Sequence, residues 1–153
     1  MTEDADLVGR LAARLEQSAQ PKLGRRLALY PVVAGDCGGC ALELYALRGL
    51  IYRLERLGLR FVPTPFQADV LLITGALTRA LADPVRRAWE AAGAPKWVIA
   101  VGDCAADGGV FKGSYSVLGG VRETVPVDII VPGCPPDPAD ILRALVAVLE
   151  ANA

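Results

Sequence analysis

Short runs of consecutive apolar residues recur along the chain and alternate with segments of helical periodicity. Runs that are apolar at every position, rather than at every second one, are typical of strands buried on both faces of a sheet. The intervening helices supply the crossover connections that parallel strands require. The sequence therefore predicts an α/β fold in which helices cover both faces of a central parallel sheet. The predicted strands span residues 26–33, 59–62, 70–74, 96–101 and 127–131.

Glycine and Asp-Pro signals mark the ends of the predicted helices. A helix is expected after Cys40 as far as Gly58, a residue that suits a C-terminal cap. Asp-Pro pairs open two further helices, over residues 84–92 and from Pro138 to about Glu150. Residues 105–125 are rich in glycine and lack clear periodicity, so we expect a functional loop there.

The chain has 153 residues, the length of one domain with its own core. Leu7, Leu11 and Leu15 recur every four positions with charges between them, which indicates an amphipathic helix over residues 5–19. We therefore expect an N-terminal docking helix and linker over residues 1–25, followed by a single flavodoxin-like α/β domain over residues 26–153.

The composition excludes several classes of function. The sequence has no histidine, which rules out Ser-His-Asp and Cys-His catalysis and histidine-ligated zinc within this chain. Its 16 basic and 17 acidic residues include no basic run, so nucleic acid is not an expected partner. Apolar stretches fall short of the roughly 18 residues that span a bilayer, and no secretory signal is evident. We expect a cytoplasmic chain, and the 53% hydrophobic content suggests surface that partners bury.

All four cysteines follow predicted strands closely. Because the carboxyl ends of parallel strands meet at one edge of a sheet, we expect the four thiols to lie together. Each is close to glycine, in CGGC, GDC and PGC, which lets the backbone approach a bulky group and direct N–H groups at its sulfurs. Four thiolates match the ligand count of a [4Fe-4S] or [2Fe-2S] cluster. The residues are Cys37 and Cys40 after the first strand, Cys104 after the fourth and Cys134 after the fifth.

Three alternatives remain for these cysteines. A four-cysteine zinc site is the strongest on spacing alone, although a C-x2-C pair followed by distant single cysteines differs from the paired knuckles of a zinc ribbon. The thiols could also be buried structural residues, since free cysteine often acts as a small core hydrophobe. A flavin-binding flavodoxin-like domain is disfavoured, because no Ser/Thr-rich phosphate loop follows the first strand.

Several segments stand out together in a fixed order. They are CGGCALE at 37–43, QADVLLITGALT at 67–78, GDCAADGGVF at 102–111, YSVLGGV at 115–121 and VPVDIIVPGCPPDPADIL at 125–142. Together they resemble the small-subunit family shared by energy-converting nickel-iron hydrogenases and respiratory complex I. The similarity covers about residues 26–150, and the ordered set is far more specific than a single C-x-x-C motif.

The resemblance implies that Cys37, Cys40, Cys104 and Cys134 ligate the [4Fe-4S] cluster nearest to a large subunit. Complex I small subunits carry two adjacent cysteines at the first ligand site, whereas here two glycines separate Cys37 from Cys40, as in hydrogenases. The lack of further cysteines resembles both the compact, membrane-bound hydrogenase group and complex I, not the larger uptake hydrogenases with additional clusters.

The same resemblance implies an electron relay to or from a nickel-iron site. The implied partners are a hydrogenase or complex I-type large subunit, a ferredoxin-like iron-sulfur subunit and membrane subunits. Through them the chain would lie on the cytoplasmic face of the inner membrane. A complex I-type subunit that delivers electrons to quinone is the alternative within the family, and a zinc-stabilised structural or binding module is the alternative outside it.

Residues near the cysteines carry further expectations. The family has a glutamate matching Glu43 that is implicated in proton movement, so Glu43 is a candidate proton relay; the alternative is an acid that complements a helix N-terminus. Asp36, Asp103 and Asp107 flank the ligands and are expected to form turns. Lys112 and Tyr115 are expected near the cluster edge, where a partner could dock, although an ordinary surface role is favoured for Lys112. Phe66 departs from the family, in which many members have arginine.

Overall fold

The computed structural model describes residues 9, 10, 13, 27–35, 37–47, 59–93 and 96–151. The helix expected over residues 5–19 lies outside the described residues except for Gly9, Arg10 and Ala13, which are helical. The docking role of residues 1–25 therefore stays a prediction. Asp36 and the expected helix beyond Leu47 also lie outside the described residues.

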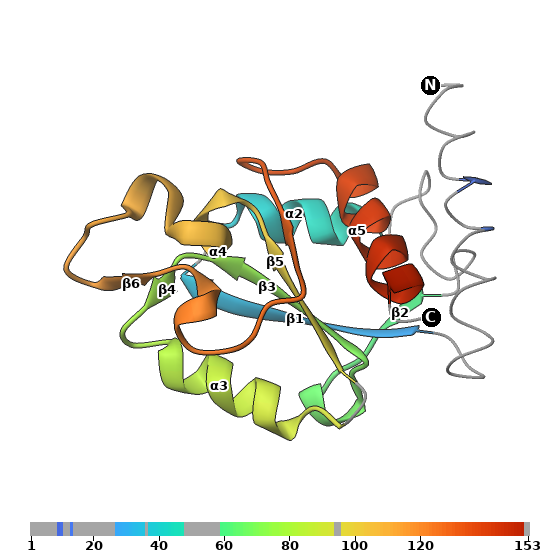
Figure 1. The fold of residues 1–153 in the computed structure, drawn as a ribbon, viewed down its shortest axis with the longest axis horizontal. Coiled ribbons are helices and arrows are strands. Elements are labelled where there is room, and N and C mark those ends of the chain that lie inside the picture. Colours follow the sequence, from blue (N-terminus) through green and yellow to red (C-terminus); the bar gives the residue numbers. More distant parts are fainter. Residues whose placement is uncertain are drawn as a thin grey trace.

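Five parallel strands form the central sheet, in the order β2-β1-β3-β5-β7. Strand β1 lies between β2 and β3. The chain therefore adds β2 on one side of β1 and then crosses to the other side to add β3, as in flavodoxin-like folds. The predicted α/β fold with a parallel sheet is confirmed (Figure 1). The strands are β1 (Leu27–Gly35), β2 (Leu59–Phe61), β3 (Val70–Gly75), β5 (Trp97–Val101) and β7 (Ile129–Val131).

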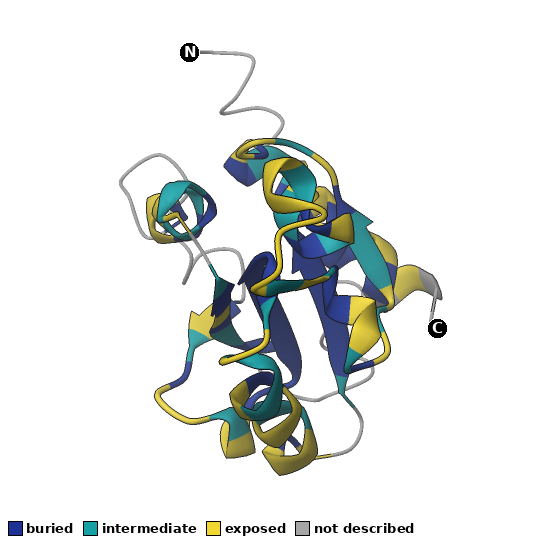
Figure 2. Ribbon diagram, turned by 90° about the vertical axis from the view of Figure 1, so that its left-hand side faces the viewer, coloured by how far each residue is buried: buried dark blue, intermediate teal, exposed yellow. Residues whose placement is uncertain are grey.

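The sheet separates two hydrophobic cores. Successive side chains of a strand point to opposite faces, so Leu72 of β3 lies in one core and Leu71 in the other. All residues of β3 and β5 are buried. This double burial explains why these strands read as continuous apolar runs. Figure 2, a view onto the carboxyl ends of the strands, shows the buried strands enclosed by helices whose outer sides are exposed.

The helices are distributed over both faces, as predicted. Helices α2 (Gly39–Ala46) and α5 (Pro138–Ala151) contact each other and cover one core. Helix α3 (Ala82–Ala91) lies on the opposite face, where Val85 packs into the second core together with Ala105 of the short helix α4 (Asp103–Asp107) (Figure 1). Over the described ranges, no helix combines the length and the apolar character that crossing a membrane requires.

The segment 105–125 contains more regular structure than the expected loop. After α4 come the 3-10 turn η3 (Gly109–Phe111), strand β6 (Val117–Gly119) and the 3-10 turn η4 (Val121–Glu123). Strand β6 pairs antiparallel with β4 (Leu77–Thr78), which follows β3 directly. Elements of two or three residues are too short to show a periodic pattern, which is why the sequence did not indicate them.

Two aspartates join neighbouring strands at the amino end of the sheet. Asp69 donates its backbone N–H to the carbonyl of Ala28 and accepts the N–H of Ala28 on its carboxylate, both at 2.9 Å. Asp128 forms the same pair of bonds with Val98, at 2.9 Å and 2.7 Å. Each pairing satisfies the amide of a buried residue and fixes the register of two strands.

Candidate functional site

The four cysteines line one pocket at the carboxyl edge of the sheet. Cys37 and Cys40 come from the turn after β1 and the start of α2, Cys104 from α4 directly after β5, and Cys134 from the turn after β7. Gly75, the last residue of β3, is also part of the lining, together with Gly39, Asp103, Gly133 and Pro135. The parallel arrangement of the strands therefore brings together residues that lie almost a hundred positions apart in the sequence.

The pocket has a buried side and an exposed side. Cys40 is buried and Cys104 is half-buried, whereas Cys37 and Cys134 are exposed, and none of the four forms a disulfide. A cavity needs about 10–15 Å³ to hold one water molecule, so the volume of about 110 Å³ accommodates a group of several atoms. Within the described residues, no three cysteine or acidic side chains are close enough to hold a single metal ion.

Backbone packs directly against two of the sulfurs. A β-carbon added to Gly102 would lie 2.6 Å from Cys40 Sγ, and one added to Gly109 would lie 3.0 Å from Cys104 Sγ. Both glycines also have positive φ angles, of 92° and 52°. The chain can approach these sulfurs so closely only because the two positions lack side chains.

The surroundings of Cys104 make a thiolate costly unless a cation is present. Burial raises the pKa of the Cys104 thiol, the neighbouring Cys134 raises it further, and the backbone N–H of Val110, which bonds to Cys104, lowers it. Thiolates crowded in this way repel one another, and a bound positive centre would relieve the repulsion. The N–H of Val110 also matches the expectation that backbone donors are directed at ligand sulfurs.

The loops that carry Cys104 and Cys134 are joined through Asp103. Its backbone N–H donates to the carbonyl of Gly133, and its carboxylate accepts the N–H of Gly133, both at 2.9 Å. Asp107 has a local role, because its carboxylate accepts the N–H of Gly109 at 2.8 Å. The expected turn-forming role is thus found for Asp107, whereas Asp103 instead joins two loops that are distant in sequence.

Glu43 lies on α2, one turn beyond Cys40. Its side chain is half-buried, and it is not among the residues that line the cysteine pocket. The helix begins at Gly39, so its first turn contains no acidic residue. The interpretation of Glu43 as a charge in the first turn is therefore wrong, whereas the proton-relay hypothesis remains a prediction. Phe66 is 78% exposed, on the 3-10 turn η2 (Pro65–Gln67), and does not line the cysteine pocket.

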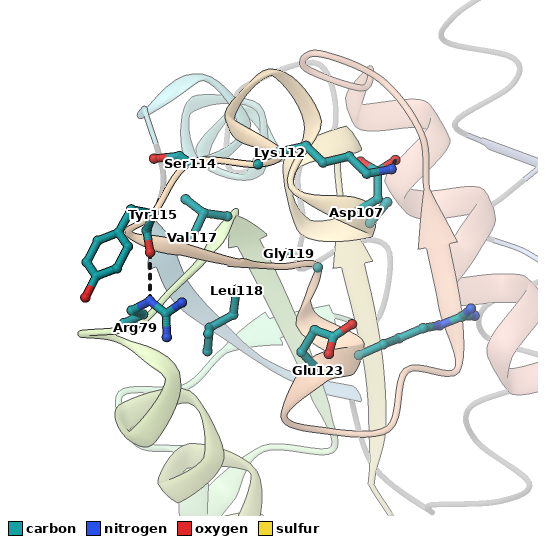
Figure 3. A pocket seen from close by; sticks show the side chains of 13 residues that line it. Arg79, Asp107, Lys112, Ser114, Tyr115, Val117, Leu118, Gly119 and Glu123 are labelled. Carbon is teal, nitrogen blue, oxygen red and sulfur yellow. Dashed lines mark hydrogen bonds and ion pairs between the residues drawn. The ribbon is translucent and has the colours of Figure 1, made fainter.

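Lys112 and Tyr115 line a second, larger hollow of about 590 Å³ beside α4 and β6 (Figure 3). Arg79, which sequence reasoning did not identify, holds Tyr115 there: its Nε donates to the Tyr115 carbonyl at 2.7 Å, and its guanidinium carbon lies 5.1 Å from the centre of the Tyr115 ring. Large apolar side chains are exposed along the same segment, namely Val110, Phe111, Tyr115 and Leu118.

Comparison with known proteins identifies the family. Residues 37–148 match the family described as NADH ubiquinone oxidoreductase, 20 Kd subunit. The chain belongs to this family. Over 137 residues it is 42% identical to formate hydrogenlyase subunit 7 of Escherichia coli (strain K12), a match that covers 90% of this chain and 54% of that protein. The chain thus spans about half the length of this curated relative, and the family resemblance of the sequence is confirmed.

Solved structures share the fold of this chain. A chain of the membrane-bound sulfane sulfur reductase, an archaeal respiratory membrane complex, superposes with a TM-score of 0.70 and 31% identity, covering 84% of this chain and 73% of that one. A chain of an NAD+-reducing [NiFe]-hydrogenase matches with a TM-score of 0.66 and 20% identity, covering 83% and 93%. The second similarity concerns the fold alone.

Proposed function

We propose that this member of the 20 Kd subunit family is an electron-transfer subunit that holds one [4Fe-4S] cluster on Cys37, Cys40, Cys104 and Cys134. The observation that carries the proposal is the convergence of four thiols, from three loops distant in sequence, in one pocket. When bound, such a cluster accepts and releases one electron at a time. The residues of the chain supply the ligands, close backbone contacts and an N–H donor to a ligand sulfur.

A cluster fits the pocket better than a single zinc ion. Tetrahedral zinc requires its four sulfurs within about 2.3 Å of one point. The volume of about 110 Å³ exceeds what one ion occupies. Iron and acid-labile sulfide in the purified protein, with an EPR signal on reduction, would support the cluster. Stoichiometric zinc in a colourless protein would contradict it.

We further propose that the chain relays electrons to or from the nickel-iron site of a large subunit in a membrane-associated hydrogenase. The 42% identity to a formate hydrogenlyase subunit supports this assignment, as does the separation of Cys37 from Cys40 by two glycines. A ferredoxin-like iron-sulfur subunit and membrane subunits would complete the complex on the cytoplasmic face of the inner membrane. Cys37 and Cys134 are exposed, so we propose that the large subunit covers this side of the cysteine pocket.

Electron delivery to quinone is the second candidate. It is favoured by the description of the matching family, which names a ubiquinone oxidoreductase subunit. The two functions differ in the metal of the large subunit. Nickel in an anaerobically purified complex, together with hydrogen-dependent dye reduction, supports the hydrogenase. An intact complex with iron but without nickel or hydrogen-dependent activity would instead support the quinone-linked function.

A further inference from the structure

We propose that Asp103 is a positioning residue that sets the separation between the sulfurs of Cys104 and Cys134; the inference rests on the proposed cluster site. Asp103 directly precedes Cys104, and its bonding partner Gly133 directly precedes Cys134. Two hydrogen bonds of 2.9 Å run in opposite directions between the two residues. Two bonds restrict both the distance between Asp103 and Gly133 and their relative rotation. The backbones of the two cysteines that follow are therefore held in a fixed relative position.

The sheet alone cannot provide this connection. Pairing of β5 with β7 ends at Val101 and Val131, and Gly102 adds one further bond of 2.7 Å to the carbonyl of Val131. Pro132 follows and has no N–H to offer. Beyond this point the carboxylate of Asp103 accepts the N–H of Gly133, which extends the connection between the strands as far as the two ligands.

The same two-bond pairing occurs twice elsewhere in the fold. Asp69 pairs with Ala28 and Asp128 pairs with Val98 in the same way, by backbone donor and carboxylate acceptor. Both of those pairings join neighbouring strands at the amino end of the sheet. Asp103 uses the same arrangement at the carboxyl end, next to the proposed ligands, where a shift between the two loops would alter the cluster geometry directly.

Two substitutions of Asp103 distinguish the effect of its hydrogen bond to Gly133 from the effect of its negative charge. Asp103→Asn keeps a carbonyl oxygen in place and removes the charge, whereas Asp103→Glu keeps the charge and moves the acceptor by one methylene group. We expect Asp103→Glu and Asp103→Ala to release iron to a chelator about tenfold faster than the unsubstituted chain, because the hydrogen bond from the Gly133 N–H is lost or displaced. Asp103→Asn should release iron at nearly the original rate.

The measurements are made on the complex purified anaerobically with its partner subunits. Besides iron release, the EPR spectrum of the reduced cluster should change in Asp103→Glu and keep its shape in Asp103→Asn. The midpoint potential of Asp103→Asn should move to a more positive value, because a nearby negative charge no longer disfavours the added electron. Asp83→Ala, which removes an exposed carboxylate on α3, is the matched control and should match the unsubstituted complex in all three measurements.

The proposal is overturned if Asp103→Glu and Asp103→Ala release iron no faster and retain the original EPR spectrum. It is equally overturned if Asp103→Asn releases iron as fast as Asp103→Glu, because the charge rather than the bond would then matter. Failure of the proposed cluster function gives a different result, namely an unsubstituted complex in which this chain contains no iron or acid-labile sulfide.

Discussion

Gly102 leaves no room for a β-carbon against the sulfur of Cys40. The added carbon would lie 2.6 Å from Cys40 Sγ, and the backbone angles of Gly102, φ 92° and ψ 167°, belong to a region that essentially only glycine occupies. We predict that Gly102→Ala destabilises the fold by about 1–3 kcal/mol and lowers the iron content of the purified protein, since Cys40 must move.

Gly93 supplies the control for that substitution. An added β-carbon meets nothing within 4 Å at Gly93. Gly93→Ala should therefore leave the iron content unchanged and the free energy of unfolding within about 0.5 kcal/mol of the unsubstituted value. Iron analysis and urea denaturation measure the two effects. Full iron occupancy in Gly102→Ala would show that the close contact with Cys40 is irrelevant to the site.

Removing the sulfur of Cys40 distinguishes a ligand from a structural thiol. Cys40 is 8% exposed, and as a small core hydrophobe it would contribute only about 1 kcal/mol to folding. As a cluster ligand, Cys40→Ala should instead abolish the visible absorption and the EPR signal. A variant that retains iron, sulfide and the EPR signal would remove Cys40 from the proposed ligand set.

Asp69 should matter for stability and not for the cluster. Asp69→Ala leaves the N–H of the fully buried Ala28 without its carboxylate acceptor, which costs about 1–3 kcal/mol. Asp69→Asn keeps an acceptor oxygen and should recover much of that loss. Urea denaturation of the metal-free chain tests the difference, and equal stability of the two variants would contradict the assigned bond.

The proton-relay hypothesis for Glu43 makes a kinetic prediction. Glu43→Gln keeps the size of the side chain and removes the carboxylate that would carry the proton, so turnover of the assembled complex should fall roughly 10²-fold or more if proton transfer passes through it. The EPR spectrum of the cluster should stay unchanged. Glu90→Gln on α3, where the side chain is 59% exposed, is the control. Unchanged turnover in Glu43→Gln would end the hypothesis.

Burial explains most of what could be predicted from the sequence. Strands such as β3 and β5 are covered on both faces, so their residues are apolar at consecutive positions and the runs are visible in the sequence. The convergence of the cysteines followed, because parallel strands end at a common edge. Interactions between short segments, or between segments distant in the chain, produce no periodic pattern in the sequence. The pairing of Thr78 with Val117 and the contact of Arg79 with Tyr115 depend on how the chain folds back.

The Asp83-Pro84 pair predicts that helix α3 begins at residue 84, two residues after its actual start. The helix begins at Ala82, so both residues occupy its first turn. Proline is tolerated there, because backbone N–H groups of the first turn have no partner within the helix. Asp83 instead forms ion pairs with Arg86 and Arg87, one turn further along.

The one-sided opening of the cysteine pocket has a consequence for the order of assembly. Cys40 forms the interior of the pocket, and Cys37 and Cys134 form the rim that faces solvent. If a large subunit covers this rim, it also narrows the route by which iron, sulfide and dioxygen reach the sulfurs. Maturation is then faster before docking than after it, and the docked partner would slow oxidative damage to the cluster for as long as the complex persists.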